Sequence, residues 1–224
     1  MDFKIEDLPN SSFNILLAKR RSGKSYLTEH IIKEMKKLNM IDTACLFSGT
    51  DNGFDMIDPP YRFNNIEMLD IILDNYKLMN EYNKIQTKEK LKFRIRTAII
   101  LDDLAIDLKS KKFNIIEKLA VNGRHFGYAP LSLHIFILSQ SLTKIPRVVR
   151  LNCDCMIMNQ FSSSNELALV ADENLYITSH DREAKRMAMK FYEFIVNEPY
   201  SFCVIELFRS NIRRLEDYIK KIKA

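Results

Sequence analysis

The stretch that decides the fold is LLAKRRSGKSYLTEH, residues 16–30. An apolar run typical of a strand buried on both faces, residues 13–18, leads into it, and a helical run, residues 25–37, follows. Between them a glycine, a lysine and a hydroxyl stand in the order of a phosphate-binding loop, whose general form is G-x-x-x-x-G-K-[ST]. The sequence therefore predicts a strand, a phosphate cradle and a helix in direct succession.

The predicted cradle is short and basic. Its candidate nucleotide-binding residues are Ala18, Lys19, Arg20, Arg21, Ser22, Gly23, Lys24, Ser25 and Tyr26. In such a loop the backbone N–H groups and the positive helix N-terminus hold phosphate oxygens. Lys24 would reach the β- and γ-phosphates, and the Ser25 hydroxyl would bind Mg²⁺. Ala18 stands where the motif has glycine, which costs little if its φ stays negative. Lys19, Arg20 and Arg21 would brace the triphosphate, contact a neighbouring molecule, or simply be solvated.

A second acidic element supports the nucleotide site. IILDD, residues 99–103, is an apolar strand that ends in two carboxylates. Asp102 would hold Mg²⁺, directly or through water, and Asp103 would polarise the attacking water. Another predicted strand, residues 133–140, ends in Gln140. If that strand lies between the strands that carry the loop and Asp102, Gln140 points at the γ-phosphate, where it would orient water or sense hydrolysis.

The order of the elements predicts the fold class. Apolar, strand-like runs alternate with helical ones, which indicates an α/β fold with a mainly parallel sheet and helices on both faces. We expect one ATPase domain over residues 1–208 and a basic, helical C-terminal tail over 209–224. The expected strands are 13–18, 43–48, 97–103, 133–140, 155–160 and 201–208, and the expected helices are 25–37, 66–84, 113–122 and 181–196.

Composition sets broad limits on function. The 224 residues are 46% hydrophobic and 28% charged, as in an ordinary soluble globular protein. The net charge of +5 permits a nucleic-acid partner without demanding one. No apolar run reaches the roughly 18 residues of a membrane span, and the first residues lack a secretory signal, so we expect a protein that is not secreted. The four cysteines lie in or beside strand-like runs, which predicts buried, reduced thiols.

A loop, an acidic strand end and a strand that ends in SQ together imply an extra strand between the two nucleotide-binding strands. This arrangement resembles the additional-strand P-loop ATPases. With "NGRH" (122–125), "ILSQS" (137–141), "PRVVRLNCD" (146–154) and "EPYSF" (198–202), the chain resembles the FtsK–HerA superfamily of DNA-pumping ATPases. Within that superfamily it resembles the genome-packaging ATPases of nucleocytoplasmic large DNA viruses and virophages. The resemblance spans roughly residues 10–210.

The resemblance implies a RecA-like fold, ATP and Mg²⁺ as cofactors, and double-stranded DNA as the molecule that is moved. It further implies a homo-oligomeric ring, a pentamer or a hexamer, with ATP between neighbouring subunits. Arg124 matches the arginine that reaches the neighbour's γ-phosphate; Arg147 and Arg150 are further candidates for the interface or for DNA. Capsid vertex proteins are candidate partners. The expected location is the viral factory in the host-cell cytoplasm, and the virion.

In such a motor, the basic side of the C-terminal tail would touch DNA phosphates through Lys220, Lys221 and Lys223. A docked amphipathic helix with a solvated basic side is the alternative reading of the tail.

Two other functions fit part of the pattern. A nucleotide or small-molecule kinase would also have the loop and arginines, but it has no need of the acidic pair or the SQ strand end. A nucleotide-gated DNA-binding scaffold with negligible turnover would fit Ala18 and Asp103. A GTPase fits least, because the sequence has no NKxD motif for reading the base.

Overall fold

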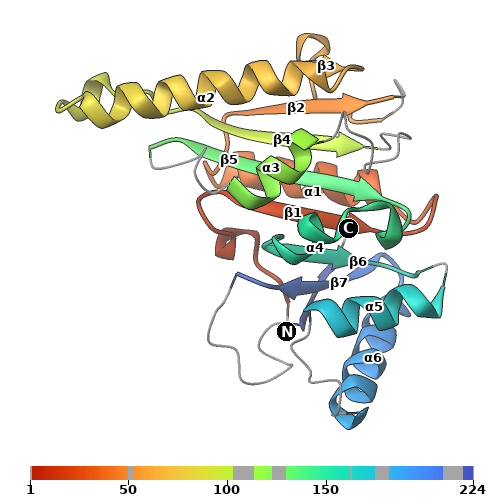
Figure 1. Ribbon diagram of the computed structural model, residues 1–224. Coiled ribbons are helices and arrows are strands. Elements are labelled where there is room, and N and C mark those ends of the chain that lie inside the picture. The colour runs from red at the N-terminus through yellow and green to blue at the C-terminus, as the bar shows by residue number, and fades with distance from the viewer. Residues whose placement is uncertain are drawn as a thin grey trace.

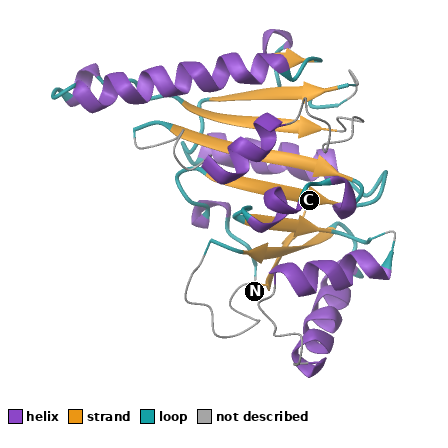
Figure 2. Cartoon of the chain, in the orientation of Figure 1, coloured by secondary structure: helices purple, strands orange, loops and turns teal. Residues whose placement is uncertain are grey.

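The computed structural model describes residues 2–49, 53–102, 114–122, 130–161, 163–174, 182–208 and 219–223. Within these residues the chain forms one eight-stranded sheet with helices on both faces (Figures 1 and 2). The strands are β1 (Ser12–Leu17), β2 (Thr43–Ser48), β3 (Arg62–Phe63), β4 (Arg96–Asp102), β5 (Ser132–Ser139), β6 (Cys155–Met158), β7 (Ser201–Glu206) and β8 (Ile219–Lys223). The helices are α1 (Lys24–Lys37), α2 (Glu67–Ile85), α3 (Asn114–Asn122), α4 (Arg147–Leu151), α5 (Ser164–Asn174) and α6 (Arg182–Val196).

The strand order is β3-β2-β4-β5-β1-β6-β7-β8. All pairs from β3 to β6 are parallel, whereas the pairs β6–β7 and β7–β8 are antiparallel. β5 therefore lies between β1, which leads into the phosphate-binding loop, and β4, which ends at Asp102. The predicted additional strand and the mainly parallel sheet are confirmed.

Side chains of the central strands alternate between two buried clusters, one on each face of the sheet. In β1, Ile15 and Leu17 belong to the cluster that α2 to α6 cover, whereas Leu16 belongs to the cluster under α1. All three are no more than 1% exposed, which is why the run is continuously apolar rather than alternating. α1 buries Leu27, Ile31, Ile32 and Met35, the face that the sequence predicts.

Every strand and helix expected before the C-terminal tail is present, with ends that differ by no more than two residues. β3, α5 and β8 were not expected. The four cysteines are free and buried, and burial raises the pKa of Cys45 to about 11 and that of Cys203 to about 12. The thiols are thus buried and free, as predicted, and burial favours their protonated form. No described helix combines the length and the apolar character that crossing a bilayer requires.

The expected helix at the C-terminus is wrong for residues 219–223, which form β8 along the outer edge of β7. Lys220 points from β8 into the protein, where its Nζ lies 2.7 Å from Glu206 Oε1 and 3.6 Å from Asp7 Oδ2. Residues 219–223 form a strand because this structure lets them bury two isoleucines and the paired Lys220 against the rest of the sheet. Lys220 therefore does not contact DNA. Residues 209–218 lie outside the described part of the chain.

The buried ion pair makes Lys220 a structural residue. Glu206 is fully buried, and Lys220→Gln would remove the ammonium that lies 2.7 Å from its carboxylate. We expect a loss of about 3–5 kcal/mol in the free energy of unfolding. Lys223→Gln, at a side chain that is 55% exposed, should cost less than about 1 kcal/mol. Urea unfolding of the two variants measures both values; equal, small losses would contradict the structural role.

Candidate functional site

The loop between β1 and α1 has the backbone of a phosphate cradle. Gly23 precedes the first helical residue with φ 87°, and Arg21 has φ 62°. A Cβ at Gly23 would meet no atom within 4 Å, so glycine is needed there for its left-handed φ and not for space. Ala18 is absent from the described residues with positive φ. The alanine is therefore tolerated for the reason that the sequence predicts.

Lys24 is the first residue of α1 and turns back over the loop. Its Nζ donates to the carbonyl oxygens of Ala18 at 2.8 Å and Lys19 at 3.1 Å. Gly23 has no side chain to cap the first-turn N–H groups of the helix, and these groups carry the positive end of the helix dipole. The ammonium and the helix N-terminus together make this loop a site for phosphate oxygens.

Strand register brings the acidic and amide residues to the same edge of the sheet as the loop. Asp102 pairs with Leu138 across β4 and β5, and Leu17 pairs with Ser139 across β5 and β1. The Ala18 N–H donates to the Ser139 carbonyl oxygen at 3.2 Å, which joins the start of the loop to the end of β5. Gln140 follows at once and is exposed, whereas Asp102 is only 8% exposed. A carboxylate at this edge and the Ser25 hydroxyl are oxygen ligands of the kind that Mg²⁺ prefers.

A cleft of ≈ 860 Å³ lies beside the loop. Exposed tyrosines stand on the two segments that border it, Tyr26 on α1 and Tyr200 in the turn before β7. Its volume is in the range of small-molecule sites. The lining residues come from the loop, the end of β6 and the turn before β7: Lys19, Arg20, Arg21, Ser22, Gly23, Tyr26, Asn159, Gln160, Val196, Asn197, Glu198, Pro199, Tyr200 and Phe202.

The turn before β7 is tied to the C-terminal strand. Glu198, which lines the cleft, accepts hydrogen bonds from Lys221 at 2.8 Å and from Lys223. These two ammonium groups lower the pKa of Glu198 to about 2, so it stays ionised at neutral pH. Both lysines are thus already paired with a carboxylate, and their predicted contact with DNA gains no support from the structure.

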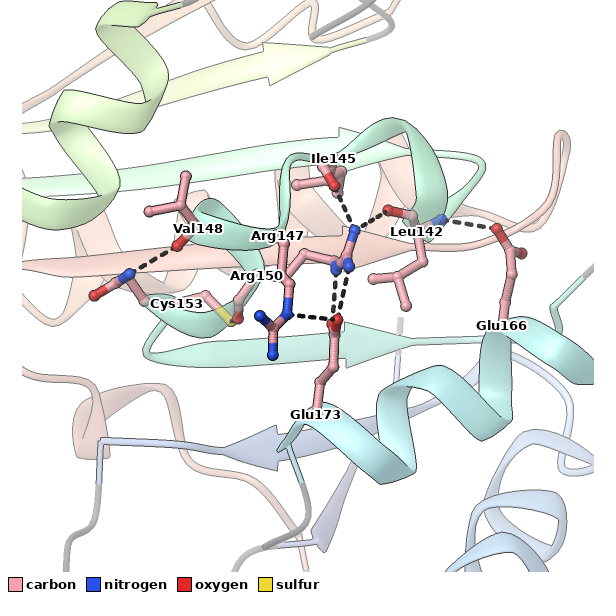
Figure 3. Close-up of polar contacts among 9 residues, drawn as sticks. Leu142, Ile145, Arg147, Val148, Arg150, Cys153, Glu166 and Glu173 are labelled. Carbon is pink, nitrogen blue, oxygen red and sulfur yellow. Dashed lines mark hydrogen bonds and ion pairs between the residues drawn. The ribbon is translucent and has the colours of Figure 1, made fainter. Parts of the chain in front are cut away.

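Arg150 is a buried residue that fastens the segment after β5 (Figure 3). Its Nε and Nη2 donate to the two carboxylate oxygens of Glu173 on α5, at 2.7 and 2.8 Å, and its Nη1 donates to the Ile145 carbonyl oxygen at 2.6 Å. Arg150 is 7% exposed. The prediction that it contacts DNA or a neighbouring subunit is wrong, because all of its forked donors face inward. The Arg147 side chain, by contrast, is 73% exposed and remains a candidate.

α5 also holds the turn that carries Gln140, and sequence reasoning missed it. Glu166 accepts from the Leu142 N–H at 2.9 Å and from the Ser141 hydroxyl at 2.5 Å, directly after the SQ strand end. The signal was present: Ser163 and Glu166 have the S-x-x-E spacing of a capping box before an apolar run. Glu166 and Glu173 thus position the segment that follows the functional edge.

Two predicted site residues lie outside the described part of the chain. These are Asp103, directly after β4, and Arg124, two residues after the end of α3. Their roles stay predictions. The described residues do bring together Asp102, Gln140 and the loop from Ala18 to Ser25 at one edge of the sheet.

The two arginines of α4 provide a matched stability test. Arg150→Lys keeps the charge but cannot make the two-pronged contact with Glu173, so we expect a loss of about 2–3 kcal/mol in the free energy of unfolding. Arg147→Lys, at an exposed side chain 3.5 Å from the same carboxylate, should change it by less than about 0.5 kcal/mol. Chemical denaturation compares the two; a similar effect at both positions would contradict the assigned contact.

No protein-family model matches the sequence, and no curated protein matches it significantly. Among solved structures, the chain is similar to the genome-packaging NTPase B204 of Sulfolobus turreted icosahedral virus 2 in complex with ATP-γS. The TM-score is 0.60 and the identity 17%, over 96% of this chain and 98% of that one. It is also similar to the pCW3 conjugation coupling protein TcpA with ATP-γS, with a TM-score of 0.62 and 16% identity, over 96% and 60% of the two chains.

A third similar structure is the cytoplasmic domain of the type VII secretion ATPase EccC of Thermomonospora curvata, with a TM-score of 0.58 and 16% identity. The match covers 96% of this chain and 25% of that one. At such identities the likeness establishes the fold. The chain therefore has the RecA-like P-loop fold shared with a viral genome-packaging NTPase and with conjugation and secretion ATPases, as the sequence predicts.

Proposed function

We propose that this chain is an ATP-driven translocase of double-stranded DNA that packages a viral genome into a preformed capsid. The observation that carries the proposal is the position of β5 between β1 and β4. Gln140 follows the end of β5, so this strand order supports a role for its side chain in orienting the water that attacks the γ-phosphate. A kinase, which transfers the phosphoryl group to an acceptor, has no use for this strand end. The fold shared with B204 over nearly the whole of both chains adds support.

The residues have distinct roles in this proposal. Loop N–H groups and Lys24 bind the triphosphate, and Lys24 exchanges its carbonyl partners for phosphate oxygens. Ser25 and Asp102 would hold Mg²⁺, which neutralises charge that develops on the phosphate oxygens. Asp103 polarises the attacking water and Gln140 orients it. The remainder of the nucleotide occupies the cleft beside the loop, where Tyr26 and Tyr200 offer faces on which a base would stack.

Assembly into a ring completes the proposal. The three consecutive basic residues of the loop, Lys19 to Arg21, are exposed and would face the triphosphate or the next subunit. Arg124 would reach from one subunit to the γ-phosphate bound by its neighbour, since a guanidinium is always charged and forks onto phosphate oxygens. Capsid vertex proteins would anchor the ring, a pentamer or hexamer, in the infected cell.

The catalytic assignment is tested by ATP hydrolysis with and without double-stranded DNA. DNA should stimulate the wild-type protein. Lys24→Ala should lower the rate at least about 100-fold under both conditions, because the transition-state charge loses a fixed donor. Asp102→Ala should abolish the Mg²⁺-dependent part. Lys36→Ala, which removes an exposed charge from the same helix, should hydrolyse ATP like the wild type. Wild-type turnover in a folded Lys24→Ala protein would sink the assignment, and turnover only with a small acceptor would establish a kinase.

Action of Arg124 across subunits predicts rescue between two inactive variants. Arg124→Ala should bind ATP but hydrolyse it about 10³-fold or more slowly, the contribution of arginine fingers elsewhere. Mixed with Lys24→Ala, it should regain activity, because some interfaces then combine an intact loop with an intact arginine. Arg94→Ala, at a side chain that is 63% exposed, serves as the control and should remain active alone. Mixed oligomers without any rescue would exclude action in trans.

A further inference from the structure

The helix α2 has two apolar stripes, and only one is buried. Its inward stripe packs on the sheet through Leu69, Leu73 and Tyr76. On the outward side, apolar residues recur at alternating spacings of three and four, with the exposed Asn75 completing the pattern. The exposed fractions are 36% for Met68, 54% for Ile71, 63% for Leu78, 38% for Tyr82 and 79% for Ile85. This outward stripe has the spacing of a helix–helix contact surface.

The stripe is extended and held by the segment that follows α2. The ring of Phe93, which is 45% exposed, packs edge-on against Tyr82 with centroids 5.1 Å apart. Asn83 fixes this arrangement, since its side chain accepts from the Phe93 N–H at 2.8 Å and donates to the Phe93 carbonyl oxygen at 3.0 Å. A row of exposed, large apolar side chains of this kind marks a site of association.

Charge decides what kind of partner fits. Exposed acidic residues, among them Asp74 and Glu81, line one flank of the stripe. Asp74 also pairs with Lys77 of the same helix at 2.7 Å, but α2 as a whole has four acidic residues against two basic ones and therefore keeps a negative excess. Phosphate-rich partners such as DNA or an anionic membrane surface would be repelled. An antiparallel pair of two α2 helices would bring the acidic flanks together. The partner that fits the outward stripe of α2 is therefore a helix with an apolar ridge and a basic border.

The same chain carries such a helix at the other end of the sheet. α6 buries Ala188, Tyr192 and Ile195, but Met187 is 59% exposed and Phe194 is 77% exposed on its outward side. Exposed Arg186 and Lys190 lie beside them, and α6 has four basic residues against two acidic ones, the reverse of α2. Both helices pack on the same face of the sheet, α2 at the β3 end and α6 at the β7 end (Figure 1).

We propose that the outward stripe of α2 docks on the outward face of α6 of a second copy of this chain, in a head-to-tail contact. Because the two surfaces differ and lie at opposite ends of one molecule, the contact repeats from copy to copy and closes into a ring when the rotation allows it. Apolar side chains form the centre of the contact, and Asp74 and Glu81 face Arg186 and Lys190 at its rim. The proposal specifies the interface of the ring proposed above, and it rests on that ring.

Charge reversal across the contact gives a sharp test by sedimentation velocity with Mg²⁺, ATP-γS and double-stranded DNA. Asp74→Lys with Glu81→Lys, or Arg186→Glu with Lys190→Glu, should each raise the concentration of half-assembly at least about tenfold, because like charges then meet at every contact. In a hexamer, an equimolar mixture of the two double variants should assemble like the wild type, since the variants can alternate and every contact then pairs opposite charges. A pentamer has an odd number of contacts and would keep one like-charge contact, so the mixture would restore its assembly only in part. The quadruple variant should assemble like the wild type on its own. Glu6→Lys with Glu34→Lys, on the other face of the sheet, is the control for the α2 variant, because it makes the same change in net charge away from the contact.

Failure of the interface and failure of the proposed function give different results. A wild-type protein that stays monomeric, double variants that assemble normally, or double variants that neither the mixture nor the quadruple variant rescues would each overturn the interface. An assembled wild type without ATP turnover would overturn the motor and leave the interface standing. If charge reversal impairs folding, as circular dichroism would reveal, Leu78→Ser and Phe194→Ser test the two apolar sides separately, and both should weaken assembly at least about tenfold.

Discussion

Parallel strands that share a register must end at the same edge of a sheet, and the candidate nucleotide site of this protein depends on that constraint. β4, β5 and β1 are neighbours, so Asp102, Gln140 and the loop after Leu17 emerge side by side, although about 120 residues separate the loop from Gln140 along the chain. The hydrogen bond from Ala18 to Ser139 joins two of these strand ends directly. A break in the register of β5 would separate the loop from the acidic strand, whatever the local sequence of either.

Local pattern predicted these strands well because each is buried on both faces. Continuous apolar runs such as residues 13–18 and 97–101 leave little choice of structure, and the GKS turn fixes where the first run ends. The place of β5 inside the sheet was inferred from the SQ strand end and the order of motifs, and not from any periodicity. The candidate nucleotide-binding edge was thus predictable as far as Asp102 and Gln140, which follow the ends of neighbouring strands in the structure.

Prediction failed where a basic residue has a buried partner far away in the sequence. Arg150 and Lys220 both read as exposed cations, and composition cannot reveal that Glu173 or Glu206 folds back to meet them. The tail failed for a related reason. Its isoleucine and lysine spacing suits a helix when the chain is read alone, but the open edge of β7 offers backbone hydrogen bonds that a strand can use. Tertiary context decided both cases.

The two outer strands of the sheet also limit how copies of this chain can associate. β3 has only two residues, and β8 is rich in lysine and meets the N-terminal segment through the bridge between Asp2 and Lys221. Short strands and lysines discourage strand-to-strand pairing between molecules, the route by which exposed sheet edges nucleate aggregates. The backbone edges of the sheet are thus protected, which leaves side-chain surfaces on helices as the place where copies of this chain would meet.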